Sequence, residues 1–229
     1  TKDPEEIVLI GRAQGFADVA FETVVLNGGL REGVTERHLA LELENAMVEA
    51  GAEDRAFDSI VAFADHAAEP HHHLTDRELA RGDMVKLDFG ARSDGYHSDI
   101  TRTVAFGEPD PRMREIRDLV AAAQRAGIDA VRPGVSTVEV DAAARSVIAE
   151  AGHGDAFPHG LGHGVGLEIH EAPFLRWDGG EDLVEGMVVT IEPGVYIPGL
   201  GGVRIEDMVE VTADGRREIP RSTKELMVL

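Results

Sequence analysis

The sequence predicts an α+β fold of two pseudo-symmetric halves, about residues 1–110 and 111–229. Three observations predict it: a helix signal, a strand signal and a pair of acidic residues each occur twice, in the same order. The chain has 229 residues, of which 43% are hydrophobic, and is therefore long enough to bury a core. We expect both halves to pack as a single domain, with antiparallel strands facing one cleft.

The paired helix signals lie at corresponding places in the two halves. Thr35 is a helix-capping residue, and Ser136, 101 residues further on, is another. Glu139 follows Ser136 at the spacing of a capping box. The two helices are expected to end at glycines, Gly51 and Gly152.

A further helix is predicted at the start of the chain. Asp3 is a capping residue, and Pro4 occupies the first helical position, where its missing N–H costs nothing. Apolar residues then follow at helical spacing to about Val25, and a linker is expected around residues 27–29.

The strand signals place four acidic residues in two similar hairpins. In each half a leucine is followed by a glycine three residues later and by an acid six residues after that glycine, namely Asp88 and Glu192. A second acid follows a glycine-containing connection in each half, namely Asp99 and Glu206. The repeat predicts two hairpins, each with two acids that point into the cleft.

The composition excludes several classes of partner. The formal net charge is −21, and a negative surface repels phosphate groups, so nucleic acid and anionic membranes are not expected to bind. There are no cysteines, so any metal must be held by oxygen and imidazole. No apolar run approaches the ~18 residues of a membrane span, and the start at Thr1 shows no secretion signal. We expect a soluble, cytoplasmic protein.

The four acids and one histidine form a candidate metal site. Two divalent cations carry four positive charges, which four carboxylates balance, and His163 adds one imidazole. Carboxylates can bridge, so this set suits two ions about 3.5–4 Å apart, with manganese or cobalt favoured and zinc or iron as alternatives. A single acid would more simply be an exposed hairpin residue, but the repeated set favours the metal site.

A glycine-rich segment carries the histidine. In the run His159-Gly160-Leu161-Gly162-His163-Gly164-Val165-Gly166 every second residue is glycine. An extended backbone would therefore place the glycines on one face, open to close approach, and both histidines on the other. The run does not fit the G-x-G-x-x-G pattern of dinucleotide sites, and no kinase catalytic loop accompanies Asp88-Phe89-Gly90.

Together the motifs resemble the methionine aminopeptidase/prolidase/creatinase superfamily. The runs that carry the resemblance are Leu87-Asp88-Phe89-Gly90, Ser98-Asp99-Ile100-Thr101-Arg102-Thr103, Gly162-His163-Gly164-Val165-Gly166, Ile169-His170-Glu171, Thr190-Ile191-Glu192-Pro193-Gly194 and Arg204-Ile205-Glu206-Asp207. The resemblance implies a pita-bread fold with a dinuclear metal cleft. In that cleft Asp88 would chelate one ion, while His163 and Glu192 would serve the other. Asp99 and Glu206 would contact both ions.

Residues 196–203 are similar to Xaa-Pro dipeptidases and Xaa-Pro aminopeptidases. The resemblance therefore implies hydrolysis of the bond before proline in short peptides with proline at the second position. Glu192 would take a proton from the attacking water. His71 and His170 would contact the substrate and the charge that develops on it, and His159 matches a further substrate-binding histidine.

The roles of Arg204 and of two extra histidines follow from their positions. Arg204 lies two residues before Glu206, hence on the same strand face, and is expected either to orient that acid or to bind a substrate carboxylate. His72 and His73 match no motif position, and we expect them to be solvent-facing loop residues.

Three other functions compete with a Xaa-Pro dipeptidase. A Xaa-Pro aminopeptidase would act on longer peptides. A creatinase-like enzyme would hydrolyse a guanidino compound without metal, and a non-catalytic member would only bind peptides or proteins; the complete ligand set argues against both. Members of the Xaa-Pro branch usually carry an N-terminal domain that helps them dimerise. We expect that domain to be absent from residues 1–229, and a homodimer remains one expected state.

Overall fold

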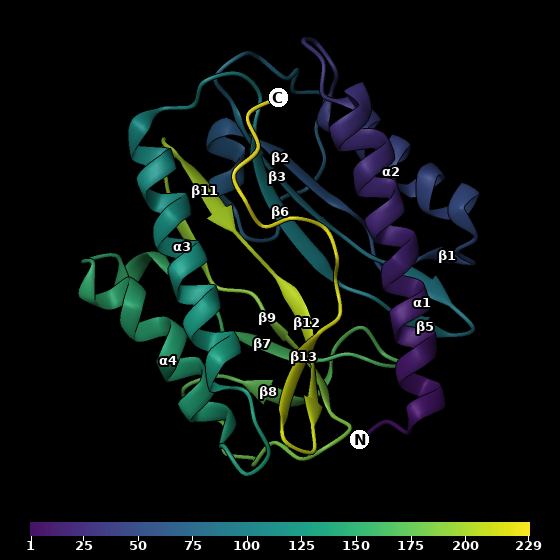
Figure 1. The fold of residues 1–229 in the computed structure, drawn as a ribbon. Coiled ribbons are helices and arrows are strands. Elements are labelled where there is room, and N and C mark those ends of the chain that lie inside the picture. Colours follow the sequence, from purple (N-terminus) through teal and green to yellow (C-terminus); the bar gives the residue numbers. More distant parts are fainter.

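The computed structural model describes residues 1–229 and contains two pairs of α-helices beside a layer of strands (Figure 1). Helix α1 packs on α2, and α3 packs on α4. None of the helices combines the length and the apolar character needed to cross a membrane. The helices are α1 (Pro4–Ala20), α2 (Glu36–Ala50), α3 (Pro111–Ala130) and α4 (Thr137–Glu150), with a π-helix at Phe21–Gly29 and 3₁₀ turns at Ala64–Ala68 and Gly154–Ala156.

The paired helices α2 and α4 begin and end as the capping residues predict. The Thr35 hydroxyl accepts a hydrogen bond from a backbone N–H at the start of α2, and Ser136 and Glu139 form a complete capping box on α4. Gly51 ends α2 in the left-handed region with φ 119°, and Gly152 follows α4 with φ 82°. These positive φ angles explain why glycine is present at both positions.

The first helix differs from the prediction at its end. Asp3 caps α1 and Pro4 occupies its first turn, as expected, but α1 ends at Ala20. The chain continues as the π-helix, which kinks at Asn27 and Gly28, within the predicted linker. The π-helix therefore covers both the last part of the predicted helix and the predicted linker.

Two antiparallel hairpins lie at the centre of the strands. The first pairs β3 with β6, and the second pairs β9 with β12. The sheets have the orders β2-β3-β6, β13-β12-β9-β7-β8, β1-β4-β5 and β10-β11. The strands are β1 (Asp54–Arg55), β2 (Ile60–Phe63), β3 (Met84–Phe89), β4 (Ala91–Ser93), β5 (Tyr96–His97), β6 (Ile100–Ala105), β7 (Gly162–Gly164), β8 (Glu171–Leu175), β9 (Val188–Ile191), β10 (Gly194–Ile197), β11 (Gly201–Arg204), β12 (Asp207–Thr212) and β13 (Gly215–Glu218).

The hairpins of the two halves meet along one short junction. Thr101 and Glu206 form an antiparallel bridge. Next to it the Thr103 hydroxyl donates to the Arg204 carbonyl at 2.8 Å and accepts from the Arg204 N–H at 3.2 Å. Asp99 directly precedes β6 and Glu206 directly precedes β12, so the junction brings an acid from each half to the same place.

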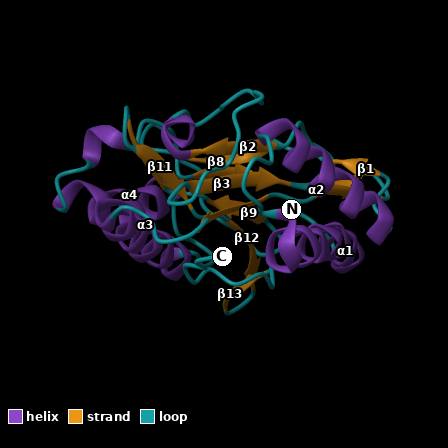
Figure 2. Cartoon of the chain, turned by 90° about the horizontal axis from the view of Figure 1, so that it is seen from above, coloured by secondary structure: helices purple, strands orange, loops and turns teal.

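The helices α1 and α3 lie on the same side of the strand layer (Figure 2). One buried cluster of 23 apolar residues belongs to the first half, and a second cluster of 23 lies chiefly in the second half. The C-terminal segment runs between α1 and α3 (Figure 1). There Ser222 donates to Asp18 of α1 at 2.6 Å, and Arg117 of α3 donates to the Lys224 carbonyl.

The glycine-rich segment packs as closely as its alternating pattern predicts. Strand β7 lies between β8 and β9. A Cβ atom at Gly162 would lie 2.0 Å from the Thr190 carbonyl oxygen, and one at Gly164 would lie 2.6 Å from the Ala172 oxygen. The glycines therefore let backbones touch on one side of β7. His163 projects from the other side.

Gly162→Ala should destabilise the fold, because the new methyl group overlaps the backbone of β9 and a strand must shift. Overpacking of this kind costs about 1–3 kcal/mol. The matched control is Gly180→Ala, where a Cβ atom meets nothing within 4 Å. Urea unfolding of both variants tests the expectation. Equal midpoints for the two would contradict the close packing of β7.

Candidate metal centre and active site

A single cavity of about 310 Å³ contains every site residue that the sequence predicts. Its floor comes from the ends of β3 and β9 and the starts of β6 and β12, and its walls come from β7 and nearby loops. The volume is suited to a ligand of a few residues. The lining residues are Phe57, Ile60, His71, Asp88, Asp99, His159, Gly160, Gly162, His163, Ile169, His170, Phe174, Arg176, Glu192, Arg204 and Glu206.

The ligand-type atoms of both halves converge in this cavity. Atoms of Asp99, His163 and Glu206 all lie within 4.8 Å of one another. The His163 Nε2 atom is 3.6 Å from Asp99 Oδ2 and 3.3 Å from Glu192 Oε1. These distances leave room for an ion between the groups.

The backbone sets the orientation of His163. Its Nδ1 atom faces the Gly164 carbonyl oxygen at 3.0 Å, and since a carbonyl can only accept, Nδ1 carries the proton. Burial lowers the pKa of His163 and favours the neutral ring. The Nε2 lone pair therefore faces the acids, as a metal-binding imidazole requires.

The carboxyl groups oppose one another's ionisation. Burial raises the pKa of Asp99 well above its usual value, and Glu206, Asp88 and Glu192 raise it further. Burial also raises the pKa of Glu192 to about 7, and burial with Glu192 and Asp88 as neighbours raises that of Glu206. Like charges in a low-dielectric cavity cannot all form without a counter-charge. Without bound metal, these carboxyl groups therefore keep protons that cations could replace.

Arg204 is the fixed positive charge of the cavity. It is 2% exposed, and although burial lowers its pKa, Tyr196 and Asp88 raise that pKa above its usual value. Its guanidinium pairs with Asp88, and it also donates to Thr101 Oγ1 at 3.1 Å, the Pro70 carbonyl at 3.1 Å and the Tyr196 hydroxyl at 2.9 Å. Arg204, from the second half, thus contacts Asp88 of the first half directly.

A chain of hydrogen bonds extends from Arg204 to His159. The Tyr196 hydroxyl accepts from Arg204 and donates to His159 Nε2 at 2.8 Å, while His159 Nδ1 donates to the Gly160 carbonyl at 2.8 Å. Burial lowers the pKa of His159 to about 3, so the ring is neutral at ordinary pH. Both its nitrogens are used within the protein, which leaves the ring surface to contact a ligand.

The residues present fit divalent cations. Asp88 Oδ1 is buried and has no hydrogen-bond partner, although the other oxygen of Asp88 pairs with Arg204. An unpaired buried carboxylate oxygen is costly, and a cation would satisfy it. The oxygen-rich donor set with a single neutral imidazole suits manganese-like ions rather than a thiolate zinc site.

The model of metallopeptidase family M24 matches residues 9–213. The chain belongs to metallopeptidase family M24. This confirms the superfamily that the sequence motifs predict. The "Xaa-Pro dipeptidase" of Pyrococcus furiosus is 45% identical to this M24 chain over 226 residues, which is 99% of the chain and 64% of that protein.

Solved structures agree with this assignment. The "Xaa-Pro dipeptidase from Bacillus anthracis" has a TM-score of 0.97 and 46% identity, and the match covers 100% of the M24 chain and 64% of that one. The "X-Pro aminopeptidase from Thermotoga maritima" has a TM-score of 0.96 and 38% identity, with 100% and 64% covered. The M24 chain is thus a mixed structure of helices and strands with the predicted pita-bread fold, and it spans 64% of the length of these relatives.

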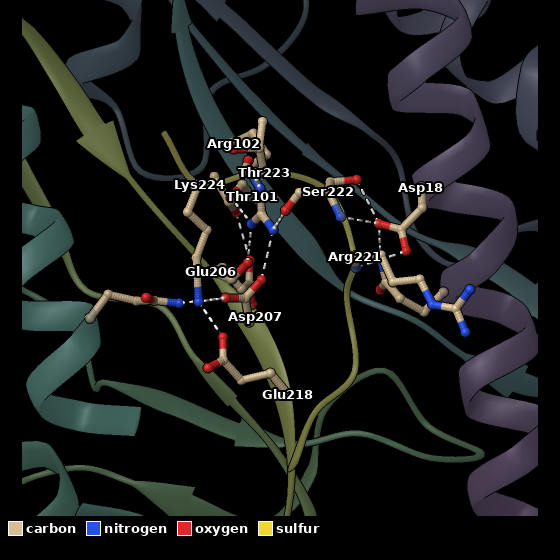
Figure 3. A network of polar contacts seen from close by, with 12 residues as sticks. Asp18, Thr101, Arg102, Glu206, Asp207, Glu218, Arg221, Ser222, Thr223 and Lys224 are labelled. Carbon is tan, nitrogen blue, oxygen red and sulfur yellow. Dashed lines mark hydrogen bonds and ion pairs between the residues drawn. The ribbon is translucent and has the colours of Figure 1, made fainter. Parts of the chain in front are cut away.

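A buried ion-pair network supports the floor of the site from behind (Figure 3). Arg102 of the M24 chain donates to the Glu206 carbonyl at 2.6 Å and to Asp207 Oδ1 at 2.7 Å. It also reaches the carbonyl oxygens of Ser222 and Thr223 in the C-terminal segment at 2.8 and 3.0 Å. The backbone that carries Glu206 is therefore fixed between the two halves.

Two threonines of the site were missed by the sequence reasoning. Thr101 donates to Glu206 Oε2 at 2.6 Å, and Thr190 donates to Glu192 Oε1 at 3.1 Å. A signal was available, because Thr101 lies two residues after Asp99 and Thr190 lies two residues before Glu192. In an extended chain that spacing places each threonine on the same face as an acid.

The prediction that His72 faces solvent is wrong, whereas His73 is exposed as predicted. His72 is 6% exposed, and its Nε2 atom faces Glu36 Oε2 at 2.9 Å. Glu36 lies in the first turn of α2 and is fully buried. The Glu36 carboxylate also accepts a hydrogen bond from the Thr75 hydroxyl. The burial of His72 therefore depends on contacts between residues that are far apart in the sequence.

Two buried cationic side chains fix the backbone of the loop that carries His71. Lys86 donates to the Ala67 carbonyl at 3.1 Å, and Arg204 donates to the Pro70 carbonyl at 3.1 Å. Burial lowers the pKa of Lys86 to about 6. The His71 side chain lines the cavity and makes no hydrogen bond with another protein group, so its ring is free to contact a ligand.

The metal-free protein should lose stability as pH rises. The pKa of Glu192 is about 7 in the folded protein and 4.5 in the unfolded chain. The folded protein therefore binds this proton more tightly than the unfolded chain does. Its contribution to stability is complete below pH 4.5 and is lost as pH rises through about 7. Glu206→Gln removes one of the opposing carboxyl groups and should gain stability over the wild type as pH increases.

Chemical denaturation of metal-free protein between pH 5 and 8 measures this difference. The control is Glu185→Gln, an exposed acid outside the cavity. Its difference from the wild type should not depend on pH. If Glu206→Gln behaved like the control, the acids would not be coupled through burial.

Proposed function

We propose that this chain forms the catalytic part of a Xaa-Pro dipeptidase, which hydrolyses the bond before proline with two divalent cations. The observation that carries the proposal is the convergence of four carboxyl groups, one oriented imidazole and two unbonded histidines in one cavity of about 310 Å³. The names of relatives at 45% and 46% identity support this substrate class.

The ligand assignment divides the cavity between the two ions. Asp88 would chelate one ion, and His163 with Glu192 would hold the other. Asp99 and Glu206, which lie on either side of the junction between the halves, would contact both. When bound, the cations would supply a water activated at neutral pH and polarise the scissile carbonyl, and manganese or cobalt suits the donor set.

The protein groups around the ions would bind, orient and move protons. Glu192 would take the proton of the attacking water, with Thr190 fixing its Oε1 atom. His71 and His170 line the cavity, and burial lowers the pKa of each, so both rings favour the neutral form. Each can then donate a single N–H to the substrate and to the negative charge that develops on it.

The apolar part of the cavity would receive the side chain of the first residue and the proline ring. Phe57 precedes β2 and Ile60 is its first residue, while Ile169 and Phe174 come from the segment around β8. Such surfaces exclude water from the reacting bond and fix the position of rigid apolar groups. Short peptides with proline at the second position are therefore the proposed substrates.

A Xaa-Pro aminopeptidase is the alternative. The observation in its favour is the similarity to the Thermotoga maritima aminopeptidase structure, at a TM-score of 0.96. Hydrolysis rates for Ala-Pro and Ala-Pro-Gly, measured side by side, distinguish the two functions. A homodimer and a cytoplasmic location stay predictions.

Chelation should abolish hydrolysis of Ala-Pro, and manganese or cobalt should restore it, because oxygen ligands hold these ions well yet exchangeably. Asp99→Asn and Glu206→Gln should lose bound metal and activity together. His71→Asn and His170→Asn should lower kcat about 100-fold with metal content unchanged, since each removes one donor to the developing charge.

Elemental analysis of the purified variants, alongside their rates, gives the comparison. Glu185→Gln again serves as the control for loss of an acid. If His71→Asn or His170→Asn contained no metal, the proposed division of the cavity residues into metal ligands and substrate-binding groups would be wrong. Full activity in metal-free protein would refute the proposed function.

A further inference from the structure

A second group of metal-binding side chains lies outside the active-site cavity, around the loop that carries His71. It consists of Glu36, His66 and His72, whose ligand atoms all lie within 4.8 Å of one another. None of the three lines the active-site cavity. The His66 Nδ1 atom faces Glu36 Oε1 at 2.9 Å, and the His72 Nε2 atom faces Glu36 Oε2, also at 2.9 Å. The two imidazole rings therefore share one carboxylate, with ring centres 4.7 Å apart.

The Glu36 carboxylate is charged and fixed in orientation by the protein. It is fully buried, and it accepts hydrogen bonds from the Phe63 N–H at 3.0 Å and from the Thr75 hydroxyl at 2.6 Å. Although burial raises the pKa of Glu36, hydrogen bonds from Thr75, Phe63 and the two histidines lower that pKa below its usual value. Hydrogen bonds that hold a carboxylate in this way are typical of groups that support a metal ligand.

The surroundings of His72 allow its Nε2 atom to bind a cation. On the other side of the ring, Nδ1 faces Glu69 Oε2 at 3.3 Å. A neutral imidazole carries one proton, and when that proton is on Nδ1 it is donated to Glu69, which leaves the Nε2 lone pair facing Glu36. Metal-binding histidines commonly donate their second N–H to a carboxylate in this manner. The His66 side chain is 30% exposed, so its ring can instead carry the proton on Nε2 and donate it to water.

The size and charge of the group suit a zinc ion. Two imidazoles and one carboxylate are a ligand set that zinc takes in proteins, with bonds of about 2.0–2.2 Å. Bonds of that length hold tetrahedral ligand atoms about 3.3 Å apart, so small rotations of the two rings would admit the ion. Glu36 and Glu69 together balance its two positive charges. Zinc binds a site with nitrogen ligands more tightly than manganese does, which distinguishes this group from the oxygen-rich cavity.

An ion has a route to the group from outside the protein. A separate cavity of about 600 Å³ has His72 and His73 among its lining residues. His66 is partly exposed at the 3₁₀ turn that follows β2. A fourth ligand position can therefore be filled by water, and the ion does not have to pass through the active-site cavity.

We propose that Glu36, His66 and His72 bind a single zinc ion, at a site separate from the two ions of the active-site cavity. The ion joins the first turn of α2 to the turn after β2 and to the loop that carries His71. Its role is to stabilise this loop, because each of the three ligands comes from a different segment. The inference does not depend on the substrate that the active site hydrolyses.

The test is calorimetric titration of zinc chloride into the metal-free 229-residue chain. To remove binding in the active-site cavity, all proteins carry Asp99→Asn and Glu206→Gln. In this background His66→Asn and His72→Asn should each abolish the binding of one zinc ion per chain. Zinc should also raise the melting temperature of the background protein, and this shift should be lost with either substitution. The matched control is His73→Asn, at an exposed histidine of the same loop, which should change neither result.

Glu69→Gln tests the site without altering a buried group. The Glu69 side chain is 70% exposed, so its replacement should leave the fold intact. It removes the acceptor of the His72 Nδ1 proton and should weaken zinc binding about tenfold, as expected for loss of a group that orients a metal ligand. Glu185→Gln, an exposed acid far along the chain, is the control and should leave the affinity unchanged. Zinc X-ray absorption spectra should show two imidazole ligands, whereas the proposed ligand set of the active site has one.

The outcomes decide the inference independently of catalysis. Loss of zinc in the His66 and His72 variants, with tenfold weaker binding in Glu69→Gln, supports it. Equal zinc binding in the background protein and in all three variants would overturn it and leave the two histidines as hydrogen-bond donors to Glu36 alone. A bound zinc ion with fewer than two imidazole ligands would also overturn it.

Discussion

The structure depends on one electrostatic constraint: four carboxyl groups share a buried cavity with a single fixed cation, Arg204. Their mutual repulsion and burial raise the pKa of three of them. A fold could avoid this cost by spreading its acids over the surface. Here the cavity keeps them together, and counter-charges from outside the protein would make the cluster stable.

The two hairpins create and hold this cluster. Each hairpin places one acid at a strand end and another before the next strand, and the Thr101–Glu206 bridge joins the two sets. Arg102 fixes the backbone of Glu206 from behind, and Arg204 ties Asp88 of the first half to β11 of the second. The close packing of β7 then presents His163 to the acids. Few of these elements can move without disturbing the site.

Much of this could be predicted from the sequence because it is local or repeated. Capping residues mark the helix ends, and the repeated acids mark both hairpins, which led to the predicted contents of the cavity. Contacts between the halves could not be predicted in the same way. The pairing of Arg204 with Asp88, the burial of His72 against Glu36 and the contacts of Arg102 with the C-terminal segment all join residues whose proximity only the packed fold determines.

The exchange of protons for cations is the most direct test of the account. Isothermal titration calorimetry of metal-free protein with manganese at pH 7, in two buffers of different ionisation enthalpy, measures both the number of ions bound and the protons released. We predict two ions per chain, with net proton release, because burial raises the pKa of Glu192 to about 7 and those of Asp99 and Glu206 well above their usual values. Binding of no ion, or binding without proton release, would contradict the account.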